Sequence, residues 1–279
     1  MCCSRLAVYV ALILLLVAQG AAADHVIGLG AEFDTEDSRA FSALGSLGVG
    51  EKSWLNASAS YNVSRGGQSD LETVFLDAGF DHHFDPVGVR LGFGYWGDSE
   101  LLDSNDLRAS LYWSGDKGSL SVDYERRAFD LTISSPLLQQ TRFIEFDADG
   151  LGLAARLQLS DRVSVFANGM HYDYSRNISL EPRVDVLRVF AFSRLNAVNS
   201  LLDDRISGGI EFEFGESVLD LRAATWHTAV FGDRVDSLGV GWLMPLAASS
   251  DIELRLSSDD TEVSGRATLF SVFLYFYGD

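Results

Sequence analysis

The chain has very little cysteine, and both cysteines lie at one end. Cys2 and Cys3 are the only two among 279 residues. From Asp24 onward the chain can therefore form no disulfide and no thiolate metal site. This absence suits a protein that crosses an oxidising compartment unfolded, where free thiols react.

Long apolar runs are also missing beyond the first 23 residues. From Asp24 onward no run of 18 apolar residues occurs, which excludes a transmembrane helix there. A bilayer then leaves one spanning structure, a closed β-barrel, because its strands pair every backbone polar group.

Basic residues are scarce relative to acids. The chain has 21 Lys and Arg against 40 Asp and Glu, and residues 1–23 hold one base and no acid, so the rest carries a formal charge of −20. Such a balance argues against nucleic acid as a partner, since phosphates would be repelled. It is compatible with cationic solutes, divalent cations or solubility during export. No residue pattern indicates a cofactor.

The first residues have the pattern of a secretory signal peptide. Arg5 gives a minimal positive region, Leu6–Gly20 is uncharged and mostly apolar, and Ala21-Ala22-Ala23 offers a cleavage site. An uncleaved N-terminal anchor is the alternative, since 18 uncharged residues are near the lower limit for spanning. We expect residues 1–23 to be removed, leaving 24–279 as one domain.

The dominant pattern beyond Asp24 is alternation with period two. In Val87–Tyr95 every odd position is apolar and every even position is glycine or arginine, and Leu151–Leu159 is similar. This predicts an all-β, antiparallel up-and-down transmembrane barrel with apolar side chains facing lipid and polar ones facing the lumen. Twelve or sixteen strands remain alternatives to the fourteen that we expect, at 25–34, 39–49, 52–63, 71–84, 86–97, 105–114, 117–128, 142–159, 161–174, 206–214, 217–230, 233–245, 250–258 and 263–277.

The connections alternate between short and long. Turn residues such as Gly50-Glu51-Lys52 fill the short ones, while 130–140 and 175–205 are long. Bacterial barrels have short periplasmic turns and longer outer loops. A secreted β-sandwich is the alternative, but fourteen strands exceed what one sandwich usually holds.

The end of the chain carries a family resemblance. Phe270, Val272, Leu274 and Phe276 alternate in an aromatic-rich closing strand. With the export signal and the period-two strands, this resembles the porin-like class of Gram-negative outer-membrane β-barrels. The resemblance implies that those four residues form the insertion signal, read by the barrel-assembly machinery, and that outer-membrane lipid and lipopolysaccharide are partners. The chain departs from the class pattern in ending on Gly278-Asp279 rather than on an aromatic residue.

Charged residues at lumen-facing positions are the first candidate site. Intramembrane charges are costly unless paired or wet, so they should face inward. They either line a wet pore that an acidic excess would make cation-preferring, or pair into a network that holds the barrel together; both roles can coexist. The nine acids and six arginines are Glu32, Asp77, Asp81, Arg90, Arg108, Asp123, Glu125, Arg127, Arg156, Glu211, Glu213, Asp220, Arg222, Glu253 and Arg255.

The longest connection, 175–205, is the second candidate. Leu187, Phe190, Leu195 and Val198 recur at helical spacing. They predict a helix that either narrows the lumen as a constriction loop or caps the rim. A strand extension is the alternative.

Histidines give a weaker signal. His82 and His83 are adjacent on a strand and point to opposite faces, so we expect no metal site there. An outer-membrane lipase or deacylase would need a base such as His171 or His227 with a nucleophile such as Ser164 or Thr225. No family motif surrounds these residues, so we expect no catalytic site.

The sequence therefore predicts an exported barrel, integral to the outer membrane, for passive diffusion of small polar solutes or ions. A lipid-modifying barrel enzyme and a non-transporting structural or adhesive barrel are the alternatives. No pattern indicates an oligomeric state.

Overall fold

The chain folds into one closed antiparallel β-barrel. A computed structural model describes residues 24–66, 69–98, 102–135, 140–176, 201–229, 232–261 and 265–278. These residues form fourteen strands, which confirms the predicted count and fold class. The strands are β1 (His25–Asp34), β2 (Arg39–Gly48), β3 (Ser53–Gly66), β4 (Ser69–His83), β5 (Val87–Gly97), β6 (Leu102–Gly115), β7 (Gly118–Ser135), β8 (Gln140–Ser160), β9 (Val163–Tyr174), β10 (Leu202–Phe214), β11 (Ser217–Thr228), β12 (Arg234–Ala247), β13 (Ser250–Thr261) and β14 (Gly265–Gly278).

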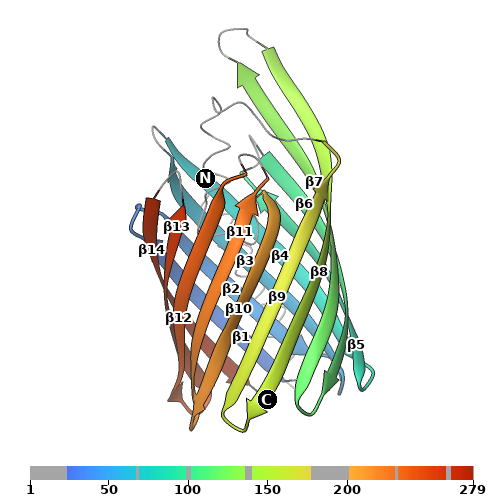
Figure 1. Cartoon of the computed structure of the whole chain (residues 1–279), viewed down its shortest axis with the longest axis vertical. Helices are drawn as coiled ribbons and strands as arrows, with labels where there is room; N and C mark the ends of the chain where they lie inside the picture. Colours follow the sequence, from blue (N-terminus) through green and yellow to red (C-terminus); the bar gives the residue numbers. More distant parts are fainter. Residues whose placement is uncertain are drawn as a thin grey trace.

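Each strand pairs with its neighbours in sequence, and the first strand closes the barrel on the last. The tilted strands can be followed around the barrel in Figure 1. His25 lies opposite Gly278 and Phe33 opposite Phe270, so β14 pairs with β1 as well as with β13. Because no sheet edge is left unpaired along this seam, every strand backbone can be satisfied within a bilayer.

Much of the outer face of the barrel is apolar. Leu29, Leu91, Leu153 and Phe270 are among many large apolar side chains that are more than two-fifths exposed. They occupy alternate positions, and their cross-strand partners on the same face are also apolar; Phe93 lies opposite Leu107, for example. The closing row Phe270, Val272, Leu274 and Phe276 shares this outer face, since its partners on β1 include Leu29 and Phe33. Its role as an insertion signal stays a prediction.

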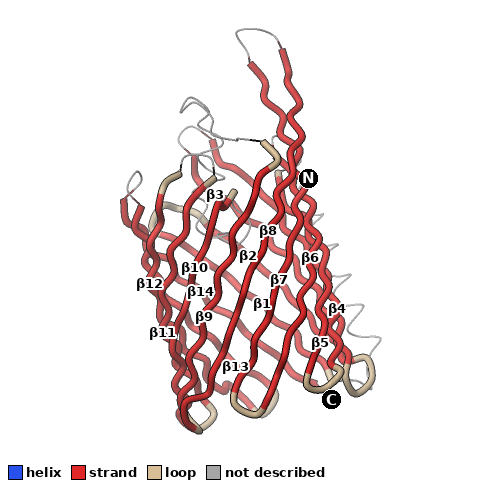
Figure 2. Tube along the Cα trace, turned by 45° about the vertical axis from the view of Figure 1, so that its right-hand side comes forward, coloured by secondary structure: helices blue, strands red, loops and turns tan. Residues whose placement is uncertain are grey.

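The two ends of the barrel differ in their connections. At the end that holds the start of β1 and the end of β14, the connections are the short ones 49–52, 84–86, 116–117, 161–162, 215–216 and 248–249. Gly215 adopts φ 65°, which a two-residue hairpin turn requires and glycine allows without strain. At the opposite end β7 and β8 extend as a hairpin beyond the other strands (Figures 1 and 2). Bacterial outer-membrane barrels show the same division into short turns at one end and longer loops at the other.

Several strands run further toward the long-loop end than the sequence indicates. We expected β6 to begin at 105, β7 to end at 128 and β10 to begin at 206, whereas they reach Leu102, Ser135 and Leu202. Backbone pairing continues there although the apolar side chains have moved to the inner face; Leu102 and Leu131 pair with each other and are buried. The alternation that marks lipid-facing strands therefore ends before the strands themselves end.

Two predicted segments lie outside the described residues. They are the signal peptide, residues 1–23, and the constriction segment with Leu187, Phe190, Leu195 and Val198. Among the residues that the structure does describe, no helix is long and apolar enough to cross a membrane.

The outward-facing leucines of β8 allow a prediction of how the cost of a buried charge depends on depth in the bilayer. Leu153 and Leu159 face outward and are equally exposed, at 59% and 58%, but Leu159 adjoins the short turn and Leu153 lies six residues further along. If this face meets lipid, Leu153→Arg should cost about 2–4 kcal/mol of unfolding free energy and Leu159→Arg about 0–1 kcal/mol. Urea unfolding of the barrel in phospholipid vesicles measures both. Equal costs would contradict the lipid-facing assignment.

Candidate functional site

The inner face of the barrel carries the charged residues that the sequence singled out. Glu32 lies between Ala40 and Ser271, Arg108 between Gly92 and Glu125, and Glu253 between Leu243 and Phe273, all on the face opposite the exposed leucines. The same register puts all fifteen candidate side chains on the lumen side. Whether they line a conducting pore stays a prediction.

The structure joins the six arginines of this set to six of its acids, one to one. Three pairs lie on single strands, two residues apart, and three join different strands. Spacing in the sequence could therefore have predicted the three pairs within single strands, but not the three pairs that join different strands. The pairs are Arg127–Glu125 at 3.1 Å, Arg222–Asp220 at 2.8 Å, Arg255–Glu253, Arg90–Asp81 at 3.0 Å, Arg108–Asp77 and Arg156–Glu211.

Three acids of the set are left over. Glu32 accepts a hydrogen bond from Ser271 Oγ at 3.0 Å, and Asp123 accepts one from Ser121 Oγ at 2.9 Å. Neither of these carboxylates, nor that of Glu213, forms an ion pair with any residue that the structure describes. The lumen set therefore consists of six ion pairs, in which the charges balance, and three further acids that give it a net negative charge.

Glycines on the inner face of β5 let side chains cross that strand. Arg108 on β6 passes over Gly92 to reach Asp77 on β4; a Cβ at Gly92 would lie 3.1 Å from the Arg108 guanidinium. Tyr112 passes over Gly88, where a Cβ would overlap its ring, and donates to Asp81 Oδ1 at 2.6 Å. The small residues at even positions of Val87–Gly97 thus make room for these cross-strand bonds.

The pair Arg127–Glu125 is buried, unlike the others. Arg127 is 2% exposed, and its guanidinium donates to Tyr172 Oη at 2.8 Å and lies 4.4 Å from the centre of the Tyr172 ring. Tyr172 Oη donates in turn to Glu125 Oε2 at 2.6 Å. The Arg127 guanidinium therefore joins β7 to β9, and the loss of any one of these three side chains would leave buried polar groups without partners.

The inner face toward the long-loop end is apolar and aromatic. Trp96, Phe129, Phe146 and Trp226 are buried there, with the Phe129 and Phe146 rings stacked 4.8 Å apart. This zone was not predicted, because inward apolar residues alternate along a strand in the same way as outward ones. The signal was present in the inward positions of β7 and β8, where Phe129 lies opposite Phe146.

Other charged lumen residues were also missed. Asp106 lies directly opposite Arg127, and Arg205 and Asp259 face inward on β10 and β13. Extending the period-two register from Arg108 by two residues would have found Asp106. Arg205 falls before the expected start of β10, so its face could not be read.

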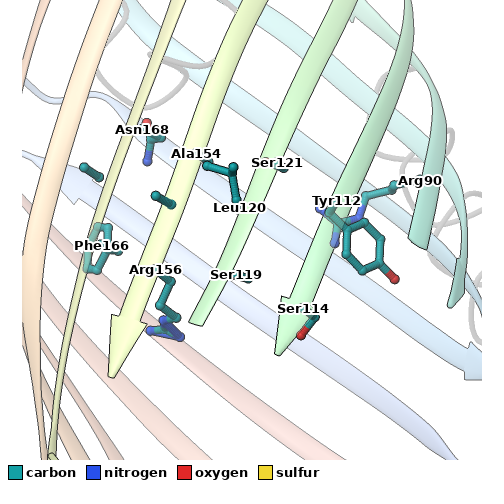
Figure 3. A pocket seen from close by; sticks show the side chains of 12 residues that line it. Arg90, Tyr112, Ser114, Ser119, Leu120, Ser121, Ala154, Arg156, Phe166 and Asn168 are labelled. Atoms are coloured by element: carbon teal, nitrogen blue, oxygen red, sulfur yellow. The ribbon is translucent and has the colours of Figure 1, made fainter. Parts of the chain in front are cut away.

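A recess opens in the inner wall of the half that is nearest to the short turns (Figure 3). It has a volume of about 370 Å³ and spans β5 to β9. Arg90 and Tyr112 lie at one end, Arg156, Phe166 and Asn168 at the other, with Ser119 and Ser121 between them in the view of Figure 3.

Among the described residues no hydrogen bond joins a candidate catalytic base to a candidate nucleophile. Ser164 faces the lumen and His171 faces outward. His227 Nδ1 is 3.0 Å from Asp204 Oδ1, and the Thr225 hydroxyl accepts from Arg234 Nε at 3.2 Å, so each has another partner. His82 bonds Ser53 on the outer face, whereas the His83 ring stacks on Tyr112. In the described part of the chain no group of three or more His, Cys, Asp or Glu is arranged to hold a metal.

Comparison with known proteins supports the fold and does not name a family. No model of a known protein family and no curated protein sequence matches the chain. Among solved structures, the chain is similar to the CymD monoaromatic hydrocarbon channel, with a TM-score of 0.56 and 10% identity over 94% of this chain and 90% of that one. It is also similar to a Pseudomonas aeruginosa FadL homologue, with a TM-score of 0.53 and 10% identity over 91% and 89%.

These likenesses, at such low identity, concern the fold alone. Together with the closed fourteen-strand architecture of the described residues, they identify the fold as that of the porin-like class of outer-membrane β-barrels. The resemblance that the sequence suggested is confirmed at the level of the fold.

Proposed function

We propose that the chain is an outer-membrane channel through which small polar solutes and ions diffuse passively, with a preference for cations. It reaches that membrane by export through a cleaved signal peptide, residues 1–23. The observation that carries the proposal is the lumen set, in which six arginines are neutralised by six acids and Glu32, Asp123 and Glu213 remain. An acidic surplus along a lumen raises the local concentration of cations and lowers that of anions.

The size of the barrel supports a wet lumen. Eight strands give a barrel that side chains just fill, and sixteen to eighteen leave an aqueous channel. Fourteen strands lie between these cases. Arg90 is 56% exposed and Arg156 is 47% exposed, as lumen side chains in contact with water would be.

The proposed partners follow from the location. Outer-membrane lipid would surround the apolar face, lipopolysaccharide would contact the long-loop end, and the barrel-assembly machinery would read the row Phe270, Val272, Leu274 and Phe276. In the described residues no hydrogen bond joins a candidate base to a candidate nucleophile, as the enzyme alternative would need, and a non-transporting barrel would not need solvent-exposed lumen charges.

Passive diffusion can be tested by osmotic swelling of liposomes. Vesicles that contain the refolded barrel should swell in isotonic glycine or glucose, at rates that fall as the solute becomes larger, because diffusion through a pore depends on size. Empty vesicles and vesicles with heat-unfolded protein are the controls. Folded barrel, shown by its heat-dependent gel mobility, that gives no swelling above empty vesicles would refute the channel.

A further inference from the structure

The recess between Arg90 and Arg156 offers unused hydrogen-bond donors at both ends. Arg90 uses Nε for Asp81, and Arg156 uses one Nη for Glu211; within the described part of the chain no hydrogen bond engages their other N–H groups, which can therefore bind a solute. The Asn168 carbonyl oxygen accepts from Ser207 at 2.7 Å, so its amide NH₂ remains available. These guanidinium and amide N–H groups donate and cannot accept, so they bind an acceptor such as a hydroxyl oxygen, and the two guanidinium charges repel an ammonium group.

The acids around the recess disfavour an anion. Asp81 and Glu211 balance the charges of the two arginines. Asp123 lies beside Ser121, and Glu213 follows Glu211 by two residues on the same face of β10. The surroundings of the recess are thus acidic overall, and a carboxylate entering it would meet repulsion from Asp123 and Glu213.

A neutral hydroxyl group suits both the hydrogen-bond donors of the recess and its acidic surroundings. It accepts from a guanidinium or an amide and donates to a serine or carboxylate oxygen, and it carries no net charge. Ser114, Ser119 and Ser121 line the recess and can act as donor or acceptor. Phe166, partly exposed, adds an apolar ring of the kind that packs against the C–H face of a sugar.

The dimensions limit the solute. A volume of about 370 Å³ is at the lower end of small-molecule sites. The recess crosses five strands, which at about 4.8 Å between strands gives a length of roughly 19 Å. It is therefore longer than one sugar ring and narrow.

We propose that this recess is a binding subsite for neutral, polyhydroxylated solutes of one or two sugar rings, held by Arg90, Arg156, Asn168 and Phe166. The proposal rests on the channel function and names a solute class for it. Binding is weak and reversible, as a diffusion pathway requires, because conduction fails if a solute cannot leave.

The test is block of the ionic current by maltose in planar bilayers, with saturation-transfer NMR on the detergent-folded barrel alongside. Maltose should lower the single-channel current along a saturating curve, beyond the linear fall caused by viscosity. Glucose should bind at least fivefold more tightly than glucuronate, its anionic counterpart. Phe166→Leu keeps apolar volume but removes the flat ring, and should weaken maltose binding about tenfold.

Matched variants separate the recess from the rest of the lumen. Phe273→Leu removes another inward-facing phenylalanine, stacked on Tyr275 outside the recess, and should leave the maltose dissociation constant unchanged. Arg156→Met should weaken binding by tenfold or more, whereas Arg255→Met, which removes a paired arginine outside the recess, should not.

The outcomes distinguish the two proposals. Maltose that neither blocks the current of a conducting barrel nor binds by NMR overturns the subsite, as does equal weakening by Phe166→Leu and Phe273→Leu. Tighter binding of glucuronate than glucose overturns the neutral class. A folded barrel that binds maltose through Phe166 without conducting overturns the channel and retains the subsite.

Discussion

Arg127→Met is expected to lower the free energy of unfolding by about 3–5 kcal/mol. Arg127 is 2% exposed and holds Glu125 and the Tyr172 hydroxyl. Methionine fills a similar volume but leaves the Glu125 carboxylate, which is 7% exposed, without its counter-charge. It also removes the positive charge that lies directly opposite Asp106. A buried charge that has lost its partner is costly because water cannot replace the partner. Urea unfolding in phospholipid vesicles, followed by tryptophan fluorescence, measures the change.

The adjacent arginine is a matched control. Arg126 faces outward, is 54% exposed, and pairs with Asp147 at 3.6 Å. Exposed pairs contribute about 0–1 kcal/mol, so Arg126→Met should change stability by no more than that. If the two variants lose the same stability, the inner network does not have the structural role that its burial implies.

The second large effect concerns ion selectivity. Changing Glu32, Asp123 and Glu213 together to glutamine removes the acids of the lumen set that no described arginine balances. We expect the cation-to-anion permeability ratio to fall from above one toward one, because the remaining charges of the set cancel in pairs and the lumen then carries less negative charge. Reversal potentials across a tenfold KCl gradient give this ratio directly.

The control removes the same net charge from the outer face. Asp147, Asp149 and Asp173 lie on alternate, outward positions of β8 and β9, and changing them to asparagine should alter the ratio much less. Equal effects of the two triple variants would show that selectivity follows the overall charge of the protein rather than the lumen acids.

Much of the barrel follows from the sequence because its pattern is simple. In Val87–Tyr95 the alternation of apolar residues with glycine or arginine assigns both faces, and a one-residue slip would put Arg90 in lipid. The closing strand was predictable for the same reason, and the structure pairs it with both β1 and β13. The seam of the barrel and the face of each candidate charge could therefore be predicted together.

Contacts that cross a strand could not be predicted. Arg108 reaches Asp77 over Gly92, and Tyr112 reaches Asp81 over Gly88, across residues separated by about thirty positions in sequence. The sequence shows where a glycine leaves space on the inner face, but it does not show which side chain fills that space. The apolar inner zone around Phe129 was missed for another reason, since inward apolar residues give the same alternation as outward ones.

Single-channel recording of the unmodified barrel in planar bilayers tests the central claim most directly. Refolded protein with heat-dependent gel mobility should give discrete, ohmic current steps, and a KCl gradient should give a reversal potential of the sign that indicates cation preference. A folded barrel that inserts into the bilayer but gives no current steps would contradict the account.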